Sequence, residues 1–281
     1  MSSPTIGAAE KDSRPGLIIL LVALGLIIAA LRLAAARGEL WFDEVWTIQG
    51  VQAAVHSPTD IVLRVKHDNN HFLNSLVVYW IGPDGTAWMY RLPAVIFGTL
   101  TVLLAVLIAR RHGWAAMLAG VILTGCSYLL VNYSSEARGY AYEMFFALAA
   151  FGSLCAAEAS ANVNWEILFS ASCILGFLAH PLFLTVYLSA QVYTWIPFGH
   201  RQQEGKRLPS VAAIICRTII PGLFFGWLYW INLSQLTIGS GESPPVLSVI
   251  VQTLSLAVGG PFDPPGSYAA AAVTLLSRWR R

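Results

Sequence analysis

A series of long apolar runs restricts this chain to a membrane protein. The first run, residues 16–36, is long enough as a helix to cross a hydrocarbon layer of about 30 Å. It is too long for the core of a signal peptide and has no A-x-A cleavage signal, so we expect a signal-anchor helix. Over the whole chain 11% of residues are charged, whereas soluble domains carry about 25%. The sequence therefore predicts an integral membrane protein, with the lipid bilayer as a partner.

The composition excludes two other classes of protein. A net charge of +2 is too small to indicate a nucleic-acid partner, and no basic cluster supports one. The short basic clusters that occur lie between or directly after apolar runs. All four cysteines fall inside apolar runs and lack the spacing of metal ligands: Cys126, Cys155, Cys173 and Cys216. We therefore expect no disulfide bond, no metal site and no cofactor.

The apolar runs predict an all-α fold, a polytopic transmembrane bundle with seven or eight spans. After the first span, further spans are expected at 92–109, 114–131, 139–157, 164–180, 182–198 and 210–233, with a last short run at 267–277. Two segments of the first outer loop are expected to be short surface helices, namely the amphipathic Val45–Val55 and the ten-residue Phe72–Ile81. Residues 246–258 are a third candidate surface helix.

Basic residues predict the orientation of the bundle. The strongest basic clusters are at Arg110–Arg111, Arg201–Arg207 and Arg278–Arg281, and the span count puts all three on one side. By the positive-inside rule this side is cytoplasmic, together with the N-terminus. The chain then divides into a cytoplasmic tail (1–15), a membrane module (16–233) that contains the outer loop 37–91, and a segment 234–281 with an outer loop and a partial last span.

The remaining polar residues gather on the opposite, outer face. Asp43 and Glu44 stand between aromatic residues just after the first span, and carboxylates are costly inside hydrocarbon. Segments remote from them in sequence emerge on the same face: His67–His71, Tyr133–Arg138 and His180. Random placement would scatter such residues over both faces, so we expect a site on the outer or periplasmic side.

Each of these residues also has a purely structural interpretation. Asp43 is a good N-cap residue for the segment that follows it. His67 and His71 have the i, i+4 spacing of half a metal site, but loop histidines are more often only solvated. Glu136 and Arg138 fit a boundary pair that reaches toward water.

His180, ahead of Pro181 at the end of a span, fits a boundary histidine better than a catalytic one.

The order and spacing of four segments resemble C-type (GT-C) glycosyltransferases, and within them the dolichyl-phosphate-mannose-protein mannosyltransferase-like group. The segments, spread over residues 17–200, are Trp41-Phe42-Asp43-Glu44, His67-Asp68-Asn69-Asn70-His71, Arg91-Leu92-Pro93-Ala94-Val95-Ile96-Phe97-Gly98 and Tyr133–Ala141. The resemblance implies a multi-span enzyme that uses a polyprenyl-phosphate-linked sugar on the outer face. Its acceptor would be a hydroxyl of a protein, lipid or glycan.

The resemblance also assigns roles to residues. It implies that Asp43 is the catalytic acid of the first outer loop, with Glu44 beside it, and that Arg138 is the outer-loop arginine. A carboxylate can take the acceptor proton and a planar guanidinium can bind the departing phosphate, so we expect Asp43 to be the base, Glu44 to orient it or the acceptor, and Arg138 to bind the donor. The other expected substrate contacts are Glu136, Tyr133, His67, Asp68, His71, Lys66 and His180.

The chain departs from the family pattern in two ways. Phe72-Leu73 stands where the family often has a Pro-Pro pair, and the chain is short beside relatives that continue with further spans. We therefore expect a truncated member that retains the first seven spans. A truncated, non-catalytic protein of the same fold remains an alternative. A transporter is a weaker one, because the spans hold few charges, Glu143 being the exception noted, and no internal repeat is found.

Overall fold

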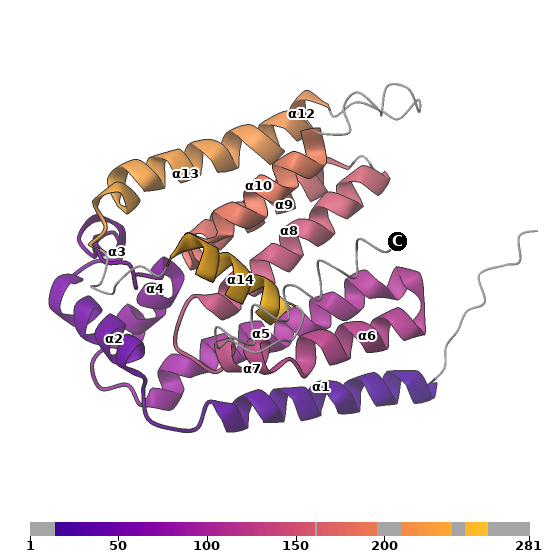
Figure 1. Cartoon of the computed structure of the whole chain (residues 1–281), viewed down its shortest axis with the longest axis horizontal. Coiled ribbons are helices and arrows are strands. Elements are labelled where there is room, and N and C mark those ends of the chain that lie inside the picture. The colour runs from indigo at the N-terminus through magenta and orange to yellow at the C-terminus, as the bar shows by residue number, and fades with distance from the viewer. Residues whose placement is uncertain (1–14, 161, 196–209, 238–244, 258–281) are drawn as a thin grey trace, which may run out of the picture. The chain divides into compact units, whose positions relative to one another are not determined.

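The computed structural model of this protein describes residues 15–160, 162–195, 210–237 and 245–257. Within these ranges every element is a helix, apart from one isolated β-bridge between His67 and Thr237, which confirms the all-α prediction for the described residues (Figure 1). The chain divides into two compact units, residues 1–237 and 238–281. The described part of the second unit is α14 (Val246–Ala257), close to the surface helix expected at 246–258.

The first unit is built around the contact between α5 and α8. Helix α5 (Ala87–Ala109) packs against α1 (Pro15–Ala35) and α6 (Trp114–Gly125) on one side and against α8 (Tyr140–Ser160) on another. Helix α8 in turn packs against α9 (Val163–Ala179), which contacts α10 (Phe183–Trp195) and α13 (Ile220–Ile231). The core between these helices is aromatic, and Phe169, Phe177 and Phe183 are fully buried there.

Three helical segments are long and apolar enough to cross a membrane: Ala87–His112, Tyr140–Ser160 and Val211–Gln235. They contain most of the spans expected at 92–109, 139–157 and 210–233. Three further apolar helices are shorter: Phe72–Ile81, Trp114–Gly125 and Val163–Ala179. Helix α1 is apolar over Ile19–Ala35. The end of the span expected at 182–198 and the whole run 267–277 lie outside the described residues.

The span expected at 114–131 is wrong as a single helix, because α6 ends at Gly125 and a separate α7 (Tyr128–Tyr133) follows. The last carbonyl groups of a helix have no partner within it, and a cation there is favourable. Arg32 of α1 supplies this cation, since its Nη1 and Nη2 donate to the carbonyl oxygens of Gly125 and Thr124 at 3.2 and 3.0 Å. Its guanidinium is buried, so α6 ends where Arg32 can reach it.

Three short helices occupy the expected outer loop: α2 (Phe42–Ala54), α3 (Asp60–Leu63) and α4 (Phe72–Ile81). Helix α2 begins three residues before the predicted Val45, because the Glu44 carboxylate accepts the Trp41 N–H at 2.7 Å. Trp41 is therefore the N-cap, and the interpretation of Asp43 as the N-cap is wrong. Helix α4 has the predicted bounds and packs against α2, α5 and α9.

Several of the segments that connect the helices meet at the end of the first unit where α2, α3 and α4 lie (Figure 1). Asn74 of α4 donates to the Ala137 carbonyl oxygen at 2.7 Å. Asn232, at the end of α13, donates to the carbonyl oxygens of Val62 and Val65 at 2.7 and 3.0 Å. Hydrogen bonds over such long sequence separations hold the polar loops together.

Besides Arg32, a pair of opposite charges lies inside the apolar helices. Arg217, in the π-helical turn Ile215–Ile219, forms two hydrogen bonds to the Glu166 carboxylate at 2.7 and 2.6 Å. Glu158 lies 3.5 Å from the same guanidinium. The statement that Glu143 is the exception among uncharged spans is therefore wrong, since Glu166 and Arg217 fall inside expected spans and compensate each other there.

Candidate functional site

Asp43 and Arg138 form the centre of the candidate site. The Asp43 Oδ2 atom lies 3.1 Å from Arg138 Nη1, and the two side chains are 45% and 19% exposed. Arg138 Nη2 donates to Asn69 Oδ1 at 3.0 Å, and the Asn69 amide donates in turn to the Asp43 carbonyl oxygen at 2.7 Å and to Thr47 Oγ1 at 3.0 Å. A partly exposed acid and a partly exposed guanidinium are thus held together by a buried amide.

The Arg138 loop is shaped by close packing between α7 and α8. The Arg138 N–H donates to the Glu136 carbonyl oxygen at 2.8 Å, which bends the chain back before α8 starts. The next residue, Gly139, has no room for a side chain, because a Cβ there would collide with the Ala179 carbonyl oxygen and lie 2.8 Å from His71 Nδ1. This close approach places Arg138 over the end of α9 and beside the outer loop.

Glu44 is a buried partner of Arg91. Its side chain is 0% exposed, and its two oxygens accept four hydrogen bonds, from Arg91 Nε at 2.9 Å, Arg91 Nη2 at 2.5 Å, the Trp41 N–H at 2.7 Å and the Ala137 N–H at 2.5 Å. A carboxylate has about four acceptor positions, so Glu44 has none left for an acceptor molecule. Glu44 therefore fixes the start of α2, which corrects the expectation that it orients the acceptor, and Asp43 is left as the acid that reaches solvent.

An aromatic stack supports Arg138 from the side of α8. The Arg138 Cζ atom lies 4.8 Å from the centre of the Tyr140 ring, in the geometry of a cation–π contact. The Tyr140 ring lies 4.5 Å from that of Tyr133 and 5.0 Å from that of His180, and His180 lies 4.8 Å from His71. The structure thus brings three of the expected contacts, Tyr133, His71 and His180, together beneath the guanidinium.

Burial makes both histidines of this stack poor bases. Burial, together with the nearby positive charge of Arg138, lowers the pKa of His71 well below its ordinary value and that of His180 to about 4. His180 Nδ1 accepts the Leu182 N–H at 3.1 Å, so its remaining proton is on Nε2. Both histidines are therefore neutral near pH 7.

Glu136 also lies beside the guanidinium. Its Oε2 is 3.9 Å from Arg138 Nη1, and its Oε1 accepts a hydrogen bond from the Asn132 amide at 2.6 Å. Burial raises the pKa of Glu136, which the Arg138 charge partly counteracts. Glu136 thus adds a second acid next to Arg138, but its side chain is only 10% exposed, so the interpretation of a pair that reaches toward water is wrong for Glu136.

Three of the expected contacts lie elsewhere. Lys66 donates to the Ile231 carbonyl oxygen at 3.0 Å, and the Asp68 N–H donates to the Thr237 carbonyl oxygen at 3.2 Å. His67 stacks on Trp46 with ring centres 5.7 Å apart, and burial lowers its pKa. Lys66 and the Asp68 backbone therefore join the outer loop to α13 and the segment after it, whereas His67 packs against α2. Within the described ranges no group of three His, Cys, Asp or Glu side chains is placed to hold a metal ion.

The sequence-based prediction missed three residues that hold the site together: Asn69, Arg91 and Tyr140. Each stands inside a segment that was singled out, but none was given a role. Arg91 carried a usable signal, since an arginine at the start of an apolar run is costly unless a carboxylate pairs with it. Asn69 and Tyr140 carried none, because their partners are remote in sequence.

No family model matches this chain, and neither a curated protein nor a solved structure matches it.

Proposed function

We propose that the protein is a membrane glycosyltransferase that moves a sugar from a polyprenyl-phosphate-linked donor to an acceptor hydroxyl. The single observation that supports it best is the 3.1 Å contact between Asp43 and Arg138, because a partly exposed carboxylate beside a guanidinium is the pair of groups that this reaction needs. The resemblance of the four segments to GT-C glycosyltransferases supports the same reaction. A purely structural ion pair needs neither the partial exposure of both side chains nor the buried amide of Asn69 between them.

In the proposed reaction the acceptor oxygen attacks the anomeric carbon of the donor sugar. As the new carbon–oxygen bond forms, Asp43 takes the hydroxyl proton, and the electrons of the breaking bond move to the departing phosphate oxygen. Arg138 stabilises this negative charge, for which its planar guanidinium offers two parallel donors. A phosphate oxygen that replaces the Asp43 carboxylate on Nη1 would also free that carboxylate to accept the proton.

This single displacement inverts the configuration at the anomeric carbon. NMR of the product formed from a donor of known configuration tests this directly. A product that retains the configuration would rule out Asp43 as the base of a one-step reaction.

We further propose that the helices form a bundle of seven or eight spans in the cell or inner membrane. The N-terminus would be cytoplasmic and Asp43 would face the outside or periplasm. Two observations support this arrangement: the basic clusters fall on one side of the predicted spans, and hydrogen bonds such as Asn74–Ala137 hold the polar loops at one end of the first unit. Labelling of single cysteines from outside the cell tests it, and reagent access to residue 84 but not to residue 111 is the expected result.

The decisive experiment measures sugar transfer from a radiolabelled polyprenyl-phosphate sugar in membranes. We expect Asp43→Asn to lower the transfer rate by about 10²- to 10⁴-fold, the usual contribution of a general base. Arg138→Lys should also lower it, because lysine keeps the charge but loses the planar pair of donors. Asp84→Asn is the matched control, since Asp84 is an exposed acid in a turn of the same outer loop.

The outcomes separate the alternatives. Loss of transfer in Asp43→Asn, with full transfer in Asp84→Asn at equal expression, supports the glycosyltransferase. Equal transfer in Asp43→Asn and wild type removes Asp43 as the base. No transfer by the wild type across hexose and pentose donors favours the non-catalytic membrane protein.

A further inference from the structure

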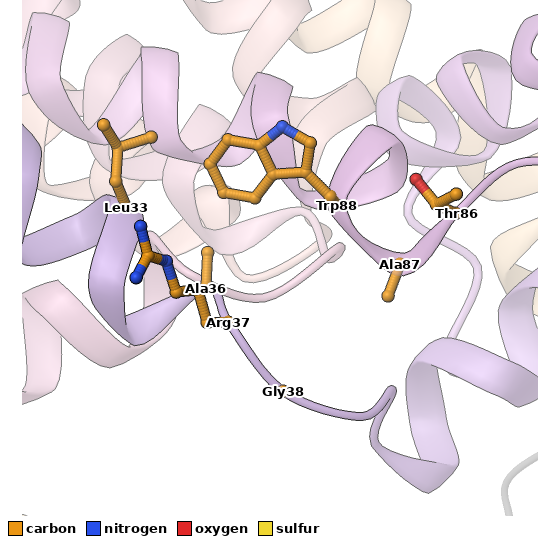
Figure 2. Close-up of a pocket in the computed structure, with 7 residues that line it drawn as sticks. All are labelled: Leu33, Ala36, Arg37, Gly38, Thr86, Ala87 and Trp88. Atoms are coloured by element: carbon orange, nitrogen blue, oxygen red, sulfur yellow. The ribbon is translucent and has the colours of Figure 1, made fainter.

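A separate cavity of about 470 Å³ lies between the end of α1 and the start of α5 (Figure 2). We call it the rim cavity. Its lining consists of Leu33, Ala36, Arg37, Gly38, Thr86, Ala87 and Trp88. Figure 2 shows the Trp88 indole extending from the start of α5 toward the side of the cavity that holds Leu33 and Arg37. No residue of the candidate site lines this cavity.

The rim cavity lies at the level where two apolar helices end. Helix α5 is part of a segment long and apolar enough to cross a membrane, and that segment starts at Ala87. Helix α1 ends at Ala35. Trp88 is 38% exposed at this level, and tryptophan is enriched where hydrocarbon meets the lipid headgroups. An indole at this position fits the headgroup level of a bilayer, where the lipid phosphates lie.

The rim cavity carries one positive charge. Arg37 is exposed and is the one ionisable side chain among the described residues that line it. The neighbouring Arg91 is not available, because its donors are taken by Glu44 and by the carbonyl oxygens of Ala36, Gly38 and Glu39. Those carbonyl contacts fix the shape of the loop that carries Arg37.

The walls around this charge are apolar, with Leu33, Ala36, Ala87 and the Trp88 ring among the lining residues. A free phosphate ion would leave these walls without a partner, whereas a lipid covers them with its glycerol and upper acyl carbons. A protein partner needs about 800 Å² of its own surface for a standard interface, which is far more than this cavity can contact.

We propose that the rim cavity binds the headgroup of an anionic phospholipid, with Arg37 contacting the phosphate and with Leu33 and Trp88 contacting the glycerol and upper acyl chain. Basic pockets between membrane helices are known to hold anionic headgroups in this way. The proposal does not depend on sugar transfer, so the two can fail separately.

Native mass spectrometry of the full chain in detergent tests this binding. The probes are phosphatidylglycerol, which is anionic, and phosphatidylcholine, which carries a phosphate but no net charge. We expect wild type to retain phosphatidylglycerol in preference, and Arg37→Gln to weaken its retention about tenfold, the effect of losing one charge-assisted hydrogen bond. Trp88→Leu should weaken both lipids. Arg111→Gln is the matched control, because Arg111 is an exposed arginine after the other end of α5.

Circular dichroism confirms that each variant keeps its helices before binding is compared. Selective loss of phosphatidylglycerol in Arg37→Gln, with wild-type binding in Arg111→Gln, supports the proposal. Equal retention of the two lipids by wild type, or equal weakening in the two arginine variants, overturns it. Displacement of the lipid by millimolar inorganic phosphate would also overturn it, since the occupant would then be a free ion.

Discussion

The adjacent acids Asp43 and Glu44 should respond in opposite ways to the loss of charge. Glu44→Gln is expected to destabilise the protein strongly, whereas Asp43→Asn should leave its stability nearly unchanged. The reason is burial, because the Glu44 side chain is 0% exposed and that of Asp43 is 45% exposed.

The magnitude follows from the partners of each carboxylate. Glu44→Gln leaves the Arg91 guanidinium buried without its counter-charge, and breaking a buried pair in this way costs about 3–5 kcal/mol. It also replaces one carboxylate oxygen with an amide NH₂. This NH₂ then faces a donor, either Arg91 or a backbone N–H, and cannot accept its hydrogen bond. Asp43→Asn weakens a solvent-screened pair, which is worth about 0–1 kcal/mol.

The free energy of unfolding can be measured by titrating the purified protein in mixed micelles with a denaturing detergent and following its helical circular dichroism. A double variant, Glu44→Leu with Arg91→Met, is the control for charge burial. It should recover part of the lost stability, because no lone charge remains buried, but not all of it, because Arg91 no longer bonds three carbonyl oxygens. Equal losses in Glu44→Gln and Asp43→Asn would refute this reasoning.

Three further predictions concern the loops around the site. Burial lowers the pKa of His180 from 6.5 to about 4, so the unfolded chain binds the proton first, and His180 by itself should destabilise the fold by about 3 kcal/mol as the pH falls from 6.5 to 4. His180→Asn should remove this contribution, so that in unfolding titrations the variant loses less stability than wild type over that range. Gly139→Ala should cost about 3 kcal/mol through its collision with the Ala179 carbonyl, whereas Gly226→Ala, with open space around it, should not destabilise the same detergent titration. Asn69→Ala should lower the sugar-transfer rate about tenfold, because it removes the amide that joins the acid and the guanidinium, and an unchanged rate would show that this amide is only structural.

Helix positions were predictable because apolar runs must form hydrogen-bonded helices wherever they are buried. The predicted bounds of 72–81 agree with α4, and the apolar run 92–109 lies inside α5. The break between α6 and α7 was not predictable in this way. It depends on Arg32, which is 92 and 93 residues away from the carbonyl groups that it binds.

The candidate site, too, was predictable from the sequence only in part. The sequence placed Asp43, Glu136 and Arg138 at one face because polar residues there avoid hydrocarbon, and the structure brings the three together. It also placed Lys66 and Asp68 there, but Lys66 and the Asp68 backbone form hydrogen bonds with α13 and the segment after it, since sharing a face does not specify a neighbour.

The sequence by itself determined that this chain is helical and apolar, and it identified the acid pair between the aromatic residues. Composition and pattern could not separate Asp43 from Glu44, because two neighbouring acids look alike in both, and their different roles were expected only from the family resemblance. Only the tertiary structure separated them. Successive residues of a helix point about 100° apart, so one turn of α2 directs Glu44 into the core against Arg91 and leaves Asp43 facing solvent beside Arg138.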